Sequence, residues 1–176
     1  MSKNIADIFK KLSSGVYVVG VAYGGQKNAF TAAWISQVSY NPLLIGLSVN
    51  PGNASYSLLR DGKCFSINVL RKGQLALARH FGTQSGRDLD KLAGMQWQAA
   101  ITGSPILTGA LAYFDCQVTA IYSPGDHHLV LGRVMDGAIL DPKALPMLYG
   151  DTGSIDQSDS LYPDHFLIEN VRSPRS

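Results

Sequence analysis

Five short segments of this 176-residue chain carry small or polar side chains where core strands would be plainly apolar. Small side chains let a flat ligand lie close to the backbone, and they leave amide N–H groups and hydroxyls open for bonding to it. These residue types therefore suit the binding of a planar, anionic cofactor on the wall of a barrel. The candidates for contact with it are Thr31, Ala32, Ala33, Trp34, Ser48, Val49, Asn50, Ser55, Asn68, Val69, His80, Phe81 and His127.

Two of these groups also have a simpler interpretation. The small side chains of Ala32 and Ala33 could instead result from close packing of two strands, without any ligand. Asn53 and Ser55 open a helical segment, whose unpaired N–H groups and dipole favour an anion by ~0.3–1 kcal/mol. Asn53 suits the role of N-cap, which leaves Ser55 for the ligand, although capping alone would explain both residues.

The two histidines among the candidates differ in their surroundings. His80 ends a helical segment, where the helix dipole favours a cation even without a ligand. His127 lies in a turn between strands, where the carboxylate of Asp126 could orient its imidazole into a cleft or simply stabilise the turn. No metal site is expected at Asp126, His127 and His128, because adjacent residues of a strand point to opposite faces.

Apolar spacing and turn signals predict the elements that position these residues. Helices are expected over 3–12, 54–62 and 74–81. Strands are expected over 16–23, 28–34, 43–49, 63–70, 110–122 and 127–139, with a tight turn at Gly24-Gly25. Residues 82–109 are interpreted as a long loop, and the segment beyond 148 receives no structure. With no βαβ unit and no GxGxxG turn, this order predicts a mainly β fold, a small Greek-key barrel with short peripheral helices.

Composition limits the function classes. A formal charge of +2 without clustered basic residues argues against nucleic-acid binding, and no segment reaches the ~18 apolar residues of a membrane span. Cys64 and Cys116 lie in apolar strand-like runs and are expected to be buried free thiols. With no apolar signal core near the start, we expect one soluble cytoplasmic domain over residues 1–176, with a core at about 10–150 and a tail at 151–176.

The order of the motifs resembles that of a known family. They are Gly15-Val16, FTAAWISQVSYNP from residue 30, FSINVL from 65, QLALARHF from 74, SPILTGALAYFDC from 104 and GDHHLVLGRV from 125. Each piece is weak alone, but their order and spacing over residues 10–150 resemble the flavin reductase-like, FMN-binding split-barrel family. The chain departs from the family pattern at Pro42-Leu43, at Trp34, where a smaller side chain is common, and in the tail, which lacks a Gly-x-Tyr sequence.

The resemblance implies a split barrel of about six to seven strands that forms a homodimer, with FMN (or FAD) at the subunit interface. Residues 31–34, 48–50, 55, 68–69 and 80–81 would hold the flavin. His127 would help to place the nicotinamide of NADH or NADPH, whose hydride passes directly to the flavin. The implied activity is NAD(P)H-dependent flavin reduction, which supplies reduced flavin or electrons to a monooxygenase or another redox partner.

Two other functions are compatible with the same residues. The first is an FMN-containing electron-transfer protein without significant NAD(P)H turnover. The second is a dimeric interaction module that binds no flavin, in which the small residues only serve packing.

Overall fold

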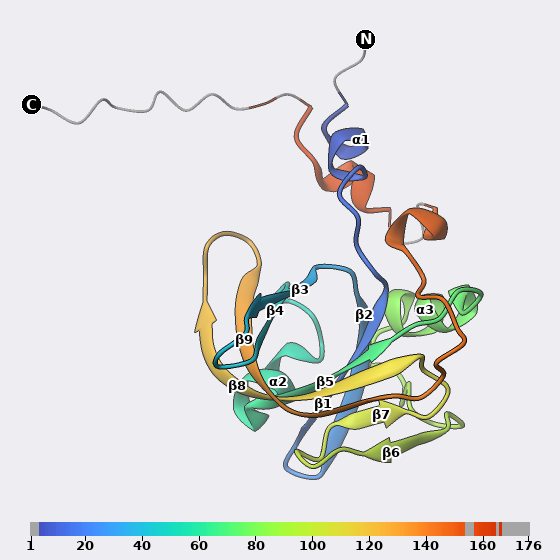
Figure 1. Ribbon diagram of the computed structural model, residues 1–176. Coiled ribbons are helices and arrows are strands. Elements are labelled where there is room, and N and C mark those ends of the chain that lie inside the picture. The colour runs from blue at the N-terminus through green and yellow to red at the C-terminus, as the bar shows by residue number, and fades with distance from the viewer. Residues whose placement is uncertain (1–3, 154–156, 165, 167–176) are drawn as a thin grey trace, which may run out of the picture.

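A seven-stranded antiparallel sheet that curls on itself forms the centre of the molecule (Figure 1). The computed structural model describes residues 4–153, 157–164 and 166. The order of the strands across the sheet is β2 (Gln26–Ala32), β1 (Tyr17–Tyr23), β5 (Cys64–Val69), β8 (Ala112–Tyr122), β9 (His128–Ile139), β4 (Leu44–Val49) and β3 (Ile35–Ser39). Strands β2 and β3 follow one another in the chain but lie at opposite edges of the sheet. The barrel is therefore split between them, and the expected mainly β split barrel is confirmed.

The sheet is buried on both faces near its centre. One apolar cluster fills the barrel and includes Val19, Val21, Phe65 and Ile67. A second cluster lies on the outer side and includes Val16 and Val18 from the same stretch of chain. Because β1 contributes to both clusters, it needs apolar side chains on both faces, which explains its nearly continuous apolar sequence.

Short elements pack against the sheet. Helix α2 (Tyr56–Gly62) adds Tyr56 and Leu59 to the cluster that fills the barrel. Helix α3 (Leu75–Thr83) and the hairpin of β6 (Trp97–Ala99) and β7 (Pro105–Leu107) cover the outer side. The interpretation of residues 82–109 as a loop is therefore wrong in part. Buried polar side chains of β5 fix this hairpin: Asn68 Oδ1 accepts from Leu107 N at 2.7 Å, and the Ser66 hydroxyl donates to the Pro105 carbonyl. Three-residue strands held by such side chains show no alternation that a sequence pattern could reveal.

The remaining expected strands and helices are present, with shifted ends. The Gly24-Gly25 turn joins β1 and β2, and both glycines have positive φ (58° and 81°). One strand was expected over 28–34, but β2 ends at Ala32. The chain then turns at Ala33 and Trp34 into β3, which was not expected as a separate strand. Cys64 and Cys116 are buried free thiols, as predicted. Within the described part of the chain, no helix is long and apolar enough to cross a membrane.

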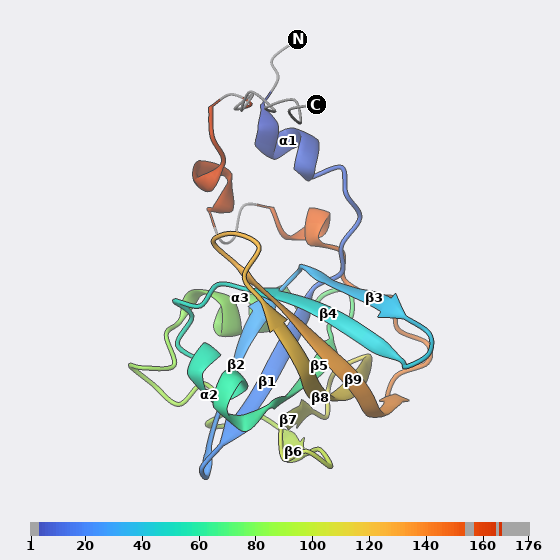
Figure 2. The ribbon, with the colours of Figure 1, turned by 90° about the vertical axis from the view of Figure 1, so that its left-hand side faces the viewer.

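The two ends of the described chain project together from the barrel (Figures 1 and 2). We call this unit the arm: residues 4–14 with α1 (Ile5–Phe9), and the described residues of 148–164 with the 3-10 helices η1 (Tyr149–Thr152) and η2 (Ser158–Leu161). At its root Tyr149 N donates to Ser14 O at 2.8 Å. Farther out, the rings of Phe9 and Tyr162 stack at 5.3 Å. The helix expected over 3–12 is shorter than predicted, and residue 3 lies outside the described residues.

Candidate functional site

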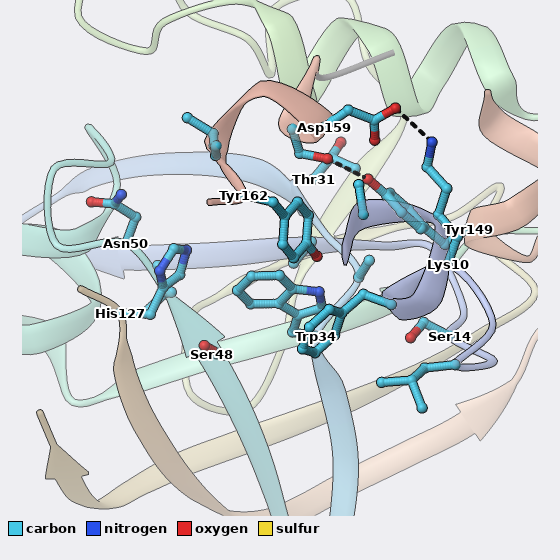
Figure 3. Close-up of a pocket in the computed structure, with 18 of the residues that line it drawn as sticks. Lys10, Ser14, Thr31, Trp34, Ser48, Asn50, His127, Tyr149, Asp159 and Tyr162 are labelled. Carbon is cyan, nitrogen blue, oxygen red and sulfur yellow. Dashed lines mark hydrogen bonds and ion pairs between the residues drawn. The ribbon is translucent and has the colours of Figure 1, made fainter. Parts of the chain in front are cut away.

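A cleft of ≈ 320 Å³ lies where the barrel is split, between the barrel and the arm (Figure 3). This volume is at the lower end of the range for small-molecule sites, about 300–1,000 Å³. The barrel side comes from the ends of β2 and β4, the corner between β2 and β3, and the turn before β9. Its residues are Phe30, Thr31, Ala32, Ala33, Trp34, Ser48, Val49, Asn50, Asn53 and His127.

Sheet pairing explains why these distant residues meet. Ser48 N donates to Trp34 O at 2.9 Å, which holds the end of β4 against the corner. On its other side β4 pairs with β9 in a register that sets Val49 opposite His128. Eight of the thirteen predicted contact residues therefore line one cleft.

The backbone of the 31–34 segment lies between the cleft and α3. Thr31 Oγ1 donates to Ala78 O of α3 at 2.7 Å. Behind Thr31, Ala32 and Ala33 is a second cavity of ≈ 90 Å³, which Gly82 and Thr83 also line. The small side chains thus form a thin wall between α3 and the cleft, which agrees with both interpretations of this segment: close packing behind it and an open ligand surface in front.

His127 contacts the corner residue Trp34. The two rings lie 4.9 Å apart with an angle of 51° between their planes. His127 Nδ1 lies 3.1 Å from Asp126 Oδ1. Because an ionised carboxylate only accepts hydrogen bonds, Nδ1 carries the proton and Nε2 is left for a ligand. The same hydrogen bond is the main cause that lowers the pKa of Asp126 below its usual value.

His128 points away from this pair. Its Nδ1 lies 2.5 Å from the hydroxyl of the buried Tyr56. Among the residues that the structure describes, no three His, Cys, Asp or Glu side chains are grouped as metal ligands.

The turn before α2 differs from expectation in one respect. The N-cap residue is Ser55 rather than Asn53, because the Asn53 side chain accepts from Ser55 N at 2.9 Å and forms a turn just before the helix. The Ser55 hydroxyl makes no capping bond. It is completely buried and has no hydrogen-bond partner among the described residues. Leaving a hydroxyl in this state costs about 1–3 kcal/mol. The Ser55 hydroxyl, close to Asn53, therefore still lacks a hydrogen-bond partner that would remove this cost.

Four predicted contact residues lie behind the cleft rather than on it. Asn68 is fully buried, and its Nδ2 donates to Val18 O at 2.9 Å. Val69 continues the pairing of β5 with β1 and β8. His80 Nε2 donates to Lys91 O at 2.8 Å, and Phe81 belongs to the outer apolar cluster. In this structure, these residues support the cleft wall through backbone and packing contacts.

The structure adds a second wall that the sequence did not predict. The arm contributes Ala6, Phe9, Lys10, Leu12, Ser14, Tyr149, Ser158, Asp159, Leu161 and Tyr162. Lys10 Nζ lies 2.5 Å from Asp159 Oδ2, and this hydrogen bond is the main cause that raises the pKa of Lys10 above 10.5. The amphipathic spacing around Phe9 and Lys10 was the only signal of this wall, and it indicated a helix without indicating what the helix faces.

One buried cation lies outside the cleft. Lys91 is only 3% exposed, and its Nζ donates to Phe81 O at 3.1 Å near the end of α3. Burial lowers the pKa of Lys91 to about 8. Burial also raises the pKa of the Cys116 thiol to about 12, so this cysteine is not a nucleophile at neutral pH.

A curled antiparallel sheet with a cleft where it stays open is a split β-barrel, and comparison with known proteins identifies its kind. Residues 9–156 match the flavin reductase like domain. The chain belongs to this family.

Solved structures agree with this assignment. The NADH:FAD oxidoreductase SgcE6 of Streptomyces globisporus is 29% identical, with a TM-score of 0.78 over 84% of this chain and 88% of that one. An FMN-binding protein of Thermus thermophilus is 32% identical, with a TM-score of 0.69 over 73% of each chain.

The chain spans only part of several curated relatives. It is 34% identical to diflavin flavoprotein A 1 of Synechocystis sp. over 140 residues, which are 79% of this chain and 24% of the relative. It is 32% identical to the high molecular weight rubredoxin of Moorella thermoacetica over 78% of this chain and 61% of the relative.

Proposed function

We propose that this protein binds FMN in the cleft and transfers a hydride to it from NADH or NADPH. The observation that carries this proposal is the cleft itself: the opening of the barrel brings the small-residue wall at 31–34 together with Ser48, Asn50 and His127. The matches to an NADH:FAD oxidoreductase and to an FMN-binding protein support the same chemistry.

The residues present fit a flavin mononucleotide. The backbone amides at 31–34 and the small side chains of Ala32 and Ala33 suit the ring, and Ser48 and Asn50 suit the polar chain that follows it. Asn53 lines the cleft, whereas the unpaired hydroxyl of Ser55 is buried outside the lining, so it would bind a phosphate or ribityl oxygen only if the turn before α2 moved. FAD, whose first half is the same, would use these residues in the same way.

The protein's own role in the transfer is to bind and orient. When bound, the flavin supplies the hydride acceptor, so no protein side chain has to transfer a proton in that step. Asp126 fixes the imidazole of His127 through Nδ1, and Trp34 supports the ring. His127 therefore acts as a positioning residue for the donor through Nε2.

The direct test is an absorbance spectrum of the purified protein before and after adding FMN, and then after adding NADH or NADPH without oxygen. Flavin bands at roughly 370 and 450 nm that bleach with the donor would support both binding and transfer. No flavin uptake at all would refute the proposal. Free FMN with the same donor, at the same concentrations, is the matched control.

The second candidate function is electron transfer by bound FMN without significant NAD(P)H turnover. The relatives favour it specifically, because this domain recurs inside longer diflavin flavoproteins and a rubredoxin. Steady-state oxidation of NADH and NADPH with added FMN separates the two functions. Turnover with either donor rules out the pure carrier, whereas bound flavin that stays oxidised with both donors refutes the reductase. In either case the electrons go to a monooxygenase or another redox partner.

We also propose that the protein forms a homodimer. Large apolar side chains are exposed on the arm and around the β3–β4 turn: Leu12 (67%), Leu161 (81%), Val38 (51%) and Tyr40 (88%). Such patches mark surfaces that a partner covers, and a stable dimer needs about 800 Å² from each copy. Sedimentation equilibrium is expected to give twice the mass of one chain, and a monomer at micromolar concentration would contradict this.

A further inference from the structure

The arm is built as one unit that faces the barrel wall across the cleft. Hydrogen bonds between residues 14–16 and 147–149 hold its root, and the Phe9–Tyr162 stack and the Lys10–Asp159 ion pair join its two segments farther out. Both segments therefore present side chains to the cleft from one common unit (Figure 3).

The charges that line the cleft are concentrated on the arm. Among the described lining residues, Lys10 is the only lysine or arginine and Asp159 the only carboxylate. The barrel wall offers hydroxyls, amides and the imidazole of His127, but no permanent positive charge. A nicotinamide dinucleotide carries a pyrophosphate, which proteins bind with cationic side chains or backbone N–H groups. In this cleft the permanent cation for such a group comes from the arm.

The ion pair of Lys10 is suited to exchange. Its two side chains are 36% and 40% exposed, and pairs exposed to this degree contribute little to stability. An ammonium has three N–H donors, so Lys10 can turn toward a phosphate at small cost. The rings of Tyr162 from the arm and Trp34 from the barrel line the same cleft, which provides apolar surface for a planar ring beside the charged group.

We propose that the arm forms the donor side of the site, with the Lys10 ammonium binding a phosphate of the nicotinamide dinucleotide while the barrel wall holds the flavin. This inference rests on the proposed function and extends it to a residue and a segment outside the barrel. It assigns donor affinity to the arm and flavin affinity to the barrel, so the two affinities are expected to respond to different substitutions.

The test compares Lys10→Gln with Lys11→Gln in the full chain. Lys11 is an exposed neighbour that does not line the cleft, so the two variants lose the same charge and differ only in its position. Binding of NAD⁺ and NADP⁺ to the FMN-loaded protein is measured by titration calorimetry, which does not depend on turnover. Lys10→Gln is expected to raise the dissociation constant about 10- to 150-fold, as for loss of one charge-assisted hydrogen bond. Lys11→Gln is expected to change it less than about twofold.

Two further measurements separate the alternatives. The affinity for FMN, followed by quenching of flavin fluorescence, is expected to be the same in both variants. If Lys10→Gln weakened FMN binding and left dinucleotide binding unchanged, Lys10 would bind the flavin phosphate and the inference would be overturned. Equal dinucleotide affinity in both variants, or no dinucleotide binding by the wild type, would also overturn it. Binding that depends on Lys10 without bleaching by NADH would support the inference and refute the reductase function alone.

Discussion

Replacing Asn68 tests whether this residue supports the fold or contacts the cofactor. Its Oδ1 accepts from Leu107 N at 2.7 Å, and its Nδ2 donates to Val18 O at 2.9 Å, with the side chain fully buried. Asn68→Ala would leave the N–H of Leu107 without a partner, which costs about 1–3 kcal/mol, and would remove a second hydrogen bond worth about 1 kcal/mol. We therefore expect the free energy of unfolding to fall by about 2–4 kcal/mol, a large share of the total of about 5–15 kcal/mol for a domain.

Urea denaturation of the flavin-free protein, followed by tryptophan fluorescence, measures this loss. Asn50→Ala is the matched control, because the Asn50 side chain also accepts a backbone N–H but is exposed to water. The control is expected to lose no more than about 0.5 kcal/mol. A loss below about 1 kcal/mol for Asn68→Ala, together with a large drop in FMN affinity of the folded protein, would refute the structural role and restore Asn68 as a cofactor ligand.

Three other substitutions test the wall, the histidine and the buried lysine. Ala33→Val adds methyl groups to the wall between the two cavities. The FMN dissociation constant should rise about tenfold, because overpacking costs about 1–3 kcal/mol. Unchanged FMN affinity in a fluorescence titration would count against the ring site. Asp126 is 91% exposed, so Asp126→Asn should raise the KM of the donor at most about threefold. His127→Ala should raise this KM about tenfold with kcat nearly unchanged. A kcat loss of about 100-fold in His127→Ala would instead indicate acid–base catalysis. The pKa of Lys91 is about 8 in the folded protein and 10.5 in the unfolded chain. Between pH 8 and 10.5 the unfolded state therefore binds more protons, and the free energy of unfolding rises with pH. Relative to Lys91→Met, the wild type should gain up to about 3 kcal/mol between pH 8 and 10.5 in urea unfolding, and parallel pH profiles would contradict the burial of a charged Lys91.

Most of the barrel was predictable because its strands are long and apolar or alternate clearly. Strand β1 carries a nearly continuous apolar run because it is buried on both faces, and the Gly24-Gly25 turn occupies backbone conformations that glycine favours. The β6–β7 hairpin was missed for the opposite reason. Its three-residue strands depend on side chains of β5, and such long-range hydrogen bonds leave no local pattern.

The cleft was predictable on its barrel side and unpredictable on its arm side. Small residues at 31–34 and the turn at Asp126 and His127 stand out in the sequence, because they interrupt apolar strands with side chains that a core does not need. Asn68 interrupts the apolar strand β5 in a similar way, yet the fold turns it toward the interior. Sequence spacing indicates that a side chain is unusual for its element, but the direction in which it points depends on the packing around it.

The sequence by itself determined the family, the mainly β architecture and the residue types of one wall of the site, because apolar periodicity and small residues act locally along the chain. Only the tertiary structure placed the opening of the barrel between β2 and β3, which brings the 31–34 wall, Ser48 and His127 around a single cleft. It also decided that Lys10 and Tyr162, from opposite ends of the described chain, form the other wall. Contacts between residues about 150 positions apart arise from the folded path of the chain, so no local pattern could predict them.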